Sequence, residues 1–421
     1  MQISVVVAES VEMADLLTHV VIVGAGHAGG TLAALLRQYG HSGLITLIGD
    51  EPIPPYQRPP LSKAWLKGEA AVESLTLKPL EFYAKANIDF RPGTRALKVE
   101  RSSREVTLSV GATLSYDFLL LATGARAIAL PIPGADLNGV LFLRTAADAE
   151  VLKAAVGPGK RLAVVGGGYI GLEVAATGRM LGAEVVVLER EPRPLARVAC
   201  KMLSTYFREH HEKHGVKFEL NASVTGFEGE DGRISGVNLA DGRVIPCDAA
   251  VVGVGAQPND DLAAESGLQT ARGVVVDTEA RTSDPQVFAI GDVSHRPMPL
   301  YGRMFRMESV PNALEQAKQA ACAIMGRPPP PGEVPWQWSD QYDLKLQIAG
   351  YAFDVSEIIV RGDPRSGKFA VFHLKGDLLQ SVEAINAPPE FMMGRQLIGS
   401  RKRIDKRKLP DLSVPMKEVS A

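Results

Sequence analysis

Residues 19–50 read HVVIVGAGHAGGTLAALLRQYGHSGLITLIGD. The short, β-branched run from Val20 to Val23 predicts a buried parallel strand. Glycines in the pattern G-x-G-x-x-G follow this run, and then come a helix over residues 31–39 and a second apolar strand over residues 44–48. A strand, a glycine turn, a helix and a strand in this order predict a βαβ unit that binds a dinucleotide.

Three glycines and one acid carry the chemistry of this unit. Gly24 permits a tight turn, Gly26 lets the backbone approach a pyrophosphate, and Gly29 lets helix and strand pack closely. The N-terminus of the helix offers free N–H groups and a positive dipole end to the phosphates. Asp50 ends the second strand 21 residues after Gly29, close to the roughly 20 residues expected for a carboxylate that binds an adenosine ribose. The alternative, a purely structural βαβ turn, leaves that spacing unexplained.

The same pattern recurs in residues 161–189, which read RLAVVGGGYIGLEVAATGRMLGAEVVVLE. Gly166, Gly168 and Gly171 repeat the glycine spacing, and Glu189 ends the next strand 18 residues after Gly171. Two fingerprints in one chain predict two bound dinucleotides. A carboxylate at Glu189 accepts hydrogen bonds from a ribose 2′-OH and repels a 2′-phosphate, which favours NADH over NADPH.

Composition limits the other possibilities. The 421 residues suggest about three domains, and the net charge of −2 argues against a general nucleic-acid binder. No apolar run approaches the ~18 residues of a membrane span. Residues 1–17 carry acids but no Lys or Arg, so we expect an extension of poor order rather than a secretory leader. Cys200, Cys247 and Cys322 lie far apart in the sequence, which favours a cytoplasmic protein with no disulfide framework and no thiolate metal site.

Two charged residues near the fingerprints have open roles. A proline-rich loop after Asp50 is stiff and leads into Lys63, at the start of an expected short helix over residues 61–68. Lys63 is either a cation held over a cofactor or an ordinary exposed lysine. Glu173 either complements the dipole of the second fingerprint helix or faces a nicotinamide pocket. We expect the histidines at 210, 211 and 214 to lie on a solvated helix surface rather than in a metal site.

Several apolar strands end in residues that could contact a nucleotide, although a plain strand end or a helix cap is the alternative for each. A helix over residues 309–325 has Pro311 in its first turn, and its N-terminus would stabilise negative charge on a reduced flavin. Strand-like pieces over residues 345–385 predict a small antiparallel sheet, followed by a helix from about residue 390 and the basic segment 401–408. The strand-end candidates are Thr123, Gly124, Gly255, Gly291 and Asp292.

Taken together, these motifs resemble the flavin-dependent NADH:ferredoxin reductases of bacterial oxygenase systems, of the putidaredoxin reductase type. The resemblance rests on the motifs VVIVGAGHAG, PPLSK, LLLATG, VVGGGYIGLEVAA, GVGAQPN, FAIGDV, ESVPNALEQA and WQWSDQY. The resemblance implies the α/β fold of glutathione reductase, with two Rossmann-like domains and a small α+β C-terminal domain. Expected boundaries are 1–17 for the extension, 18–127 with 256–328 for the FAD-binding domain, 128–255 for the NADH-binding domain and 329–421 for the C-terminal domain.

The resemblance also implies what the residues do. It places FAD on the first fingerprint and NADH on the second, with Lys63 and Glu173 as a pair near the flavin and nicotinamide. Trp338 resembles a tryptophan at the flavin edge that faces an iron–sulfur partner. The implied reaction is hydride transfer from NADH to FAD, then single-electron transfer to a [2Fe–2S] ferredoxin that supplies a cytochrome P-450 or a dioxygenase. FAD contacts are expected from Ala28, Asp50, Lys63, Ala96, Arg144, Asp292 and Val310, and nicotinamide-nucleotide contacts from Tyr169 and Ile170.

Other readings of the same motifs remain. A disulfide or peroxide reductase on this fold needs a reactive cysteine after the first ribose-binding acid, and residues 50–63 contain none. A protein resembling apoptosis-inducing factor would use bound NADH as a conformational signal, but the chain lacks a strongly basic character. A rubredoxin reductase is hardly separated from a ferredoxin reductase by sequence.

Overall fold

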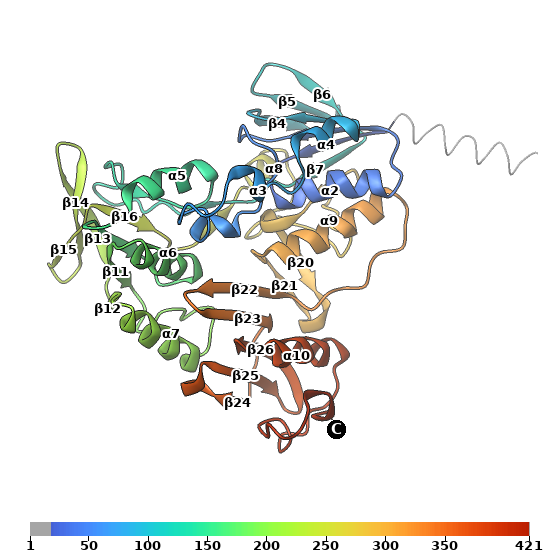
Figure 1. The fold of residues 1–421 in the computed structure, drawn as a ribbon. Helices are drawn as coiled ribbons and strands as arrows, with labels where there is room; N and C mark the ends of the chain where they lie inside the picture. Colours follow the sequence, from blue (N-terminus) through green and yellow to red (C-terminus); the bar gives the residue numbers. More distant parts are fainter. Residues whose placement is uncertain (1–17, 421) are drawn as a thin grey trace, which may run out of the picture. The chain divides into compact units, whose positions relative to one another are not determined.

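The computed structural model describes residues 18–420, and the expected extension over residues 1–17 lies outside them (Figure 1). The described chain forms two compact units. Unit 1 comprises residues 18–57, 72–125 and 258–335, and unit 2 comprises residues 58–71, 126–257 and 336–420. The expected domain boundaries remain predictions beside this division.

Unit 1 is built on a parallel sheet in which β1 is the central strand. Val20 and Ile22 pack with the helices α2 and α9, whereas Val21 and Val23 pack with residues of a second, antiparallel sheet. Both faces of β1 are therefore buried, which explains its continuous apolar run. In spatial order the sheet comprises β19 (Val287–Ala289), β7 (Phe118–Leu121), β1 (His19–Val23), β2 (Leu44–Ile48) and β3 (Ile88–Arg91).

Helices and small sheets complete unit 1, and α2 and α9 lie side by side on one face (Figure 1). The helices are α2 (His27–Gln38), α3 (Val72–Leu75), α4 (Leu80–Lys85), α8 (Asp261–Glu265) and α9 (Val310–Ile324). The small sheets are β4 (Ala96–Glu100), β5 (Glu105–Leu108) and β6 (Thr113–Ser115), and β18 (Val274–Val275), β20 (Ser294–Met298) and β21 (Arg303–Phe305).

Unit 2 repeats this plan around β10. Leu162 and Val164 pack with α6 and α7, whereas Ala163 and Val165 pack with residues of an antiparallel sheet. The parallel sheet comprises β12 (Lys217–Leu220), β11 (Glu184–Glu189), β10 (Arg161–Val165), β16 (Ala249–Val252) and β9 (Val140–Leu141). Around it lie α5 (Ala146–Ala155), α6 (Tyr169–Met180), α7 (Lys201–Lys213), β13 (Val224–Glu230), β14 (Arg233–Leu239) and β15 (Val244–Pro246).

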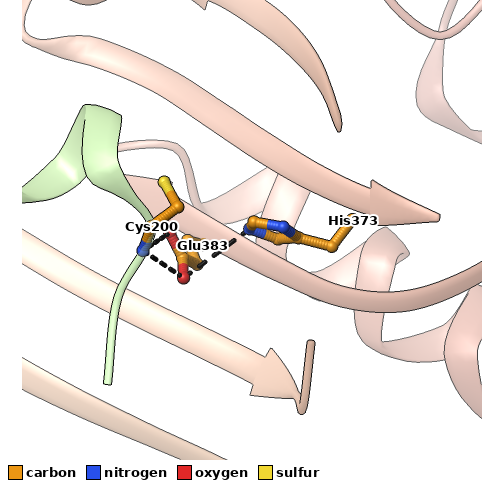
Figure 2. A group of neighbouring side chains, drawn as sticks. All are labelled: Cys200, His373 and Glu383. Atoms are coloured by element: carbon orange, nitrogen blue, oxygen red, sulfur yellow. Dashed lines mark hydrogen bonds and ion pairs between the residues drawn. The ribbon is translucent and has the colours of Figure 1, made fainter. Parts of the chain in front are cut away.

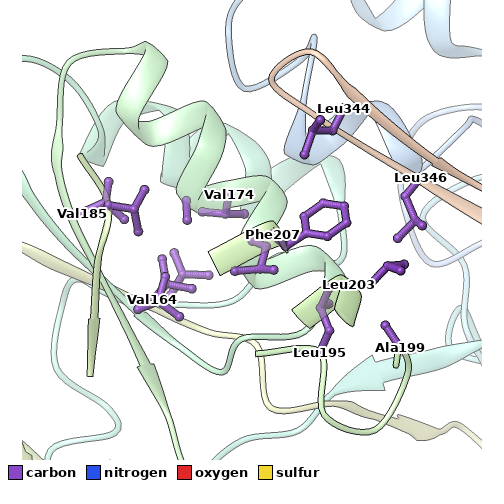
Figure 3. Close-up of a cluster of buried hydrophobic side chains, with 14 of the residues drawn as sticks. Val164, Val174, Val185, Leu195, Ala199, Leu203, Phe207, Leu344 and Leu346 are labelled. Carbon is purple, nitrogen blue, oxygen red and sulfur yellow. The ribbon is translucent and has the colours of Figure 1, made fainter. Parts of the chain in front are cut away.

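The C-terminal sheet belongs to the same unit and shares its core. Leu203 and Phe207 of α7 lie in one buried cluster with Leu344 and Leu346 (Figure 3). The antiparallel sheet comprises β22 (Trp336–Gln341), β23 (Leu344–Gly350), β26 (Leu378–Ile385), β25 (Lys368–Lys375) and β24 (Glu357–Asp363), and α10 (Pro388–Ser400) follows it. The short strands β8 (Ala125–Ala127) and β17 (Ala256–Pro258) lie at the points where the chain passes from one unit to the other.

The predicted fold class is confirmed, with corrections in detail. Helix α2 begins four residues earlier than residue 31, within the fingerprint itself. The helix expected over residues 61–68 is wrong: a 3-10 helix, η1 (Pro59–Ser62), is followed by turns. The backbone of Lys63, with φ −127° and ψ −107°, lies outside the helical region and ends the helix there. Strand β22 was not predicted. Among residues 18–420, no helix combines the length and apolar character that a membrane crossing requires.

Candidate functional site: two nucleotide cradles and a buried ion pair

The three glycines of the first fingerprint differ in the space around them: two are tightly packed and one is open. A Cβ on Gly24 would lie 2.2 Å from the carbonyl oxygen of Ala122, and one on Gly29 would lie 2.0 Å from the Gly24 oxygen. A Cβ on Gly26 would meet no described atom within 4 Å. Gly26 is also the N-cap of α2 and, as a glycine, supplies no side-chain cap. Free space therefore lies before an uncapped helix N-terminus, which suits a pyrophosphate.

The second fingerprint shows the same division. A Cβ on Gly166 would lie 2.6 Å from the Gly253 oxygen, and one on Gly171 would lie 2.1 Å from the Gly166 oxygen. A Cβ on Gly168, the N-cap of α6, would again meet no described atom within 4 Å outside its chain neighbours, and this glycine too supplies no side-chain cap. We call the spaces at Gly26 and Gly168 the two cradles. Both fit the phosphates of a dinucleotide on steric and electrostatic grounds.

The two candidate ribose-binding acids differ in their surroundings. Asp50 is 63% exposed, and its carboxylate lies 3.4 Å from the Arg95 guanidinium. The carboxylate of Glu189 accepts hydrogen bonds from the backbone N–H of Gly167 at 2.6 Å and of Glu191 at 2.8 Å. Glu189 is therefore fixed against the second fingerprint, and its role toward a ribose remains a prediction.

Lys63 and Glu173 form a close ion pair within unit 2. The Lys63 Nζ lies 2.6 Å from the Glu173 Oε2. The Ser62 hydroxyl donates to the same oxygen at 2.5 Å, and the Ser339 hydroxyl donates to Oε1 at 2.6 Å. The Glu173 side chain is 3% exposed and the Lys63 side chain 20% exposed. The buried carboxylate thus has three donors, which fix its position and hold the ammonium in one place.

Hydrogen bonds continue from this pair to helix α7. Ser339 accepts from the Gln341 amide at 3.0 Å, and the Gln341 Oε1 lies 2.7 Å from the His211 Nε2. A buried polar chain thus connects Lys63 with His211. Sequence reasoning did not select Ser62, Ser339 or Gln341, because their partners lie far away along the chain.

The expectation that the histidines lie on a solvated surface is wrong for His211, which is 0% exposed. Leu203 and Phe207 precede it at intervals of four residues and are buried too. This spacing places all three on one helix face, a signal that was present in the sequence. His210 does lie nearer the surface, 2.8 Å from the Asp343 carboxylate.

Burial of His211 predicts a pH-dependent stability. Desolvation lowers the pKa of His211 to about 4, so the folded chain keeps it neutral while the unfolded chain protonates near the ordinary value. Stability should therefore fall as pH falls through the ordinary value toward 4, by roughly 2 kcal/mol between pH 7 and pH 5. Urea unfolding followed by tryptophan fluorescence measures this loss in unit 2, which contains Trp65, Trp336 and Trp338. A His211→Gln variant should lose less stability than the parent, and equal losses would contradict the assignment.

The structure also places the other predicted contact residues. In unit 1, Gly291 N–H donates to Gln316 Oε1 at 2.8 Å, and a Cβ on Gly291 would lie 3.1 Å from the Ala28 Cβ. The Thr123 hydroxyl, next to Gly124, donates to the Asn259 carbonyl at 2.7 Å. Asp292 lies in a 3-10 turn (η2, Gly291–Val293), Ala96 begins β4 and Val310 begins α9.

Unit 2 contains the remaining candidates. The Arg144 carbonyl accepts from Arg58 at 2.5 Å. Tyr169 and Ile170 are the first two residues of α6. Gly255, with a φ of 137°, precedes β17. Trp338 lies in β22 with its ring centroid 5.5 Å from that of Trp336. The contacts of these residues with a cofactor remain predictions.

Comparison with known proteins gives consistent matches. Residues 18–317 match the family described as pyridine nucleotide-disulphide oxidoreductase, and residues 336–420 match the family described as reductase C-terminal. The chain is 52% identical over 403 residues to the probable ferredoxin reductase CtmF of Castellaniella defragrans, covering 96% of this chain and 98% of that protein. It is 39% identical to the ferredoxin–NAD(+) reductase component of the biphenyl dioxygenase system of Paraburkholderia xenovorans, covering 95% and 98%.

The fold comparison agrees. The crystal structure of the covalent putidaredoxin reductase–putidaredoxin complex matches with a TM-score of 0.93 and 40% identity, covering 96% of this chain and 98% of that one. The predicted resemblance, the predicted enzyme class and the predicted cofactors, FAD and NADH, are therefore confirmed. This chain belongs to the pyridine nucleotide-disulphide oxidoreductase family, among its FAD- and NADH-dependent ferredoxin reductases.

Proposed function

We propose that this enzyme takes electrons from NADH and delivers them singly to a [2Fe–2S] ferredoxin, which supplies a cytochrome P-450 or a ring-hydroxylating dioxygenase. The observation that carries this proposal is the pair of matching cradles at Gly26 and Gly168, each before an uncapped helix N-terminus. The names of the relatives support the acceptor, since one serves a biphenyl dioxygenase and another forms a complex with putidaredoxin.

We assign FAD to the cradle at Gly26 and NADH to the cradle at Gly168. Glu189 supports the second assignment, because its carboxylate lies at the fingerprint and would repel a 2′-phosphate. When bound, FAD supplies the conversion of a two-electron hydride into single electrons. The protein supplies alignment and charge, and we assign the charge to Lys63.

Lys63 would stabilise negative charge that develops beside it, provided that its ammonium stays in place. Glu173 provides this restraint at 2.6 Å, and the hydroxyls of Ser62 and Ser339 restrain Glu173 in turn. A preorganised charge of this kind needs no reorganisation during the reaction. The N-terminus of α9, capped by Ser309 through the Asn312 N–H at 3.3 Å, would add a positive dipole end in unit 1.

We also infer a cytoplasmic location. Cys200, Cys247 and Cys322 are free in the described chain, which is typical of a reducing compartment.

Carrier titration tests the proposal. NADH should bleach the flavin absorbance in stopped flow, and cytochrome c should then be reduced only when a [2Fe–2S] ferredoxin is added. Rubredoxin in place of ferredoxin is the control, because a rubredoxin reductase would give the opposite preference. Two results would contradict the proposal. One is cytochrome c reduction that is as fast without ferredoxin as with it, and the other is slow reoxidation of the reduced flavin together with an NADH-dependent dimer.

A further inference from the structure

Three potential metal ligands meet in unit 2, outside the polar chain described above (Figure 2). They are Cys200 at the N-cap of α7, His373 in β25 and Glu383 in β26. One ligand atom from each residue lies within 4.8 Å of the other two. His373 is 2% exposed and Glu383 4% exposed, whereas Cys200 is half-buried.

Strand pairing brings the histidine and the glutamate together. His373 is opposite Ser381, two residues from Glu383 on the same face of the antiparallel pair. Long side chains in such diagonal positions reach each other. The Glu383 carboxylate also accepts from the Cys200 backbone N–H at 3.1 and 3.2 Å. This contact brings the start of α7 to the sheet and places the thiol beside the other two side chains.

One buried ligand atom has no hydrogen bond. The His373 Nε2 makes none within residues 18–420, and its contact with the Glu383 Oε1 at 3.6 Å is an ion-pair distance longer than a hydrogen bond (Figure 2). A buried polar atom without a hydrogen bond is costly and calls for an explanation. A metal ion would satisfy a neutral imidazole nitrogen at this position. A thiolate and a carboxylate beside it would neutralise the two charges of a divalent cation.

We propose that Cys200, His373 and Glu383 bind one Zn²⁺ ion. Sulfur, nitrogen and oxygen are all zinc ligands, and the thiolate excludes Mg²⁺ and Ca²⁺ as preferred occupants. Three protein ligands leave a fourth tetrahedral position for water, which can enter beside the half-buried Cys200. The ligand atoms around a tetrahedral zinc ion lie about 3.5 Å apart. The three ligand atoms here lie within 4.8 Å of one another, so side-chain rotation has to shorten any of these distances by at most about 1.3 Å. The site does not depend on the proposed function.

Metal titration of the FAD-loaded enzyme tests this site. Calorimetry with ZnCl₂ should give one tight site per chain, and Cys200→Ser and His373→Gln should each weaken it by about a hundred-fold. With CoCl₂ as a second probe, the parent should show a thiolate-to-cobalt charge-transfer band that Cys200→Ser lacks. Glu383→Gln is the less suitable variant, because its carboxylate also holds the Cys200 backbone.

A matched control separates this site from the surface histidines. His210 in α7 and His214 at the C-cap of this helix have ring centroids 4.7 Å apart, with Asp343 beside His210, and could bind zinc weakly. A His210→Gln/His214→Gln double variant should leave the tight site unchanged. Flavin spectra and NADH-dependent bleaching verify that each variant is folded. The proposal is overturned if the parent binds no zinc, if His373→Gln binds it equally well, or if only the control variant loses it.

Discussion

A Gly168→Asp variant should keep its FAD and lose most of its affinity for NADH. The Gly168 Cβ position has open space around it, and its φ of −79° suits any residue. Aspartate is a favourable N-cap and would stabilise α6. Its carboxylate would then occupy the cradle and repel the pyrophosphate. We expect the apparent Kd for NADH to rise about a hundred-fold or more, measured by the NADH dependence of flavin bleaching.

The matched variant lies in the other fingerprint. Gly26→Asp places the same carboxylate at the equivalent N-cap of α2, where the Cβ position is also open. This variant should purify without its yellow colour and fold normally otherwise. The pair therefore tests which cradle holds which nucleotide. A yellow Gly26→Asp enzyme with weakened NADH binding would reverse the assignment.

A Lys63→Met variant should lose both stability and rate. It leaves the Glu173 carboxylate, 3% exposed, without its cation, and an unpaired buried charge costs about 3 kcal/mol or more. Flavin bleaching by NADH should slow by about a hundred-fold if the ammonium stabilises developing charge. Urea unfolding and stopped flow measure the two effects separately.

A double variant separates structure from chemistry. In Lys63→Met/Glu173→Gln the buried pair is neutral, and the amide can keep hydrogen bonds to Ser62 and Ser339. Stability should largely recover while the rate does not. Lys67→Met is the control, because its ion pair with Glu69 at 2.6 Å is more exposed and should matter by less than about 1 kcal/mol. Recovery of the rate in the double variant would reduce Lys63 to a structural role.

Local steric rules made much of this structure predictable. Glycine is needed at four fingerprint positions because a Cβ there would clash with backbone oxygens. The clashing oxygen lies five residues earlier for Gly29 and Gly171, and at the end of the adjacent strand for Gly24 and Gly166. The glycine spacing, together with the flanking apolar strands and the acid after each second strand, therefore predicted both nucleotide-binding units. The Lys63–Glu173 pair joins residues far apart in the chain, and only the resemblance to a family indicated it.

The missed features are those that depend on distant partners. Ser339 and Gln341 lie on the buried face of β22. Nothing near them in the sequence indicates that Ser339 hydrogen-bonds to Glu173 or that Gln341 hydrogen-bonds to His211. Likewise, the three ligands of the proposed zinc site come from three elements, so the spacing of cysteines along the chain could not reveal it. His211 differs, because Leu203 and Phe207 precede it at intervals of four residues and indicate a buried helix face in the sequence itself.

The shared core of α7 and the C-terminal sheet limits how such reductases can be recombined. Leu203 and Phe207 pack with Leu344 and Leu346 (Figure 3), so the C-terminal region is not a detachable module. A chimaera that exchanges only residues 336–420 would mismatch this interior and expose apolar surface to the solvent. A domain exchange that is meant to change the redox-partner preference therefore has to replace residues 126–257 together with residues 336–420.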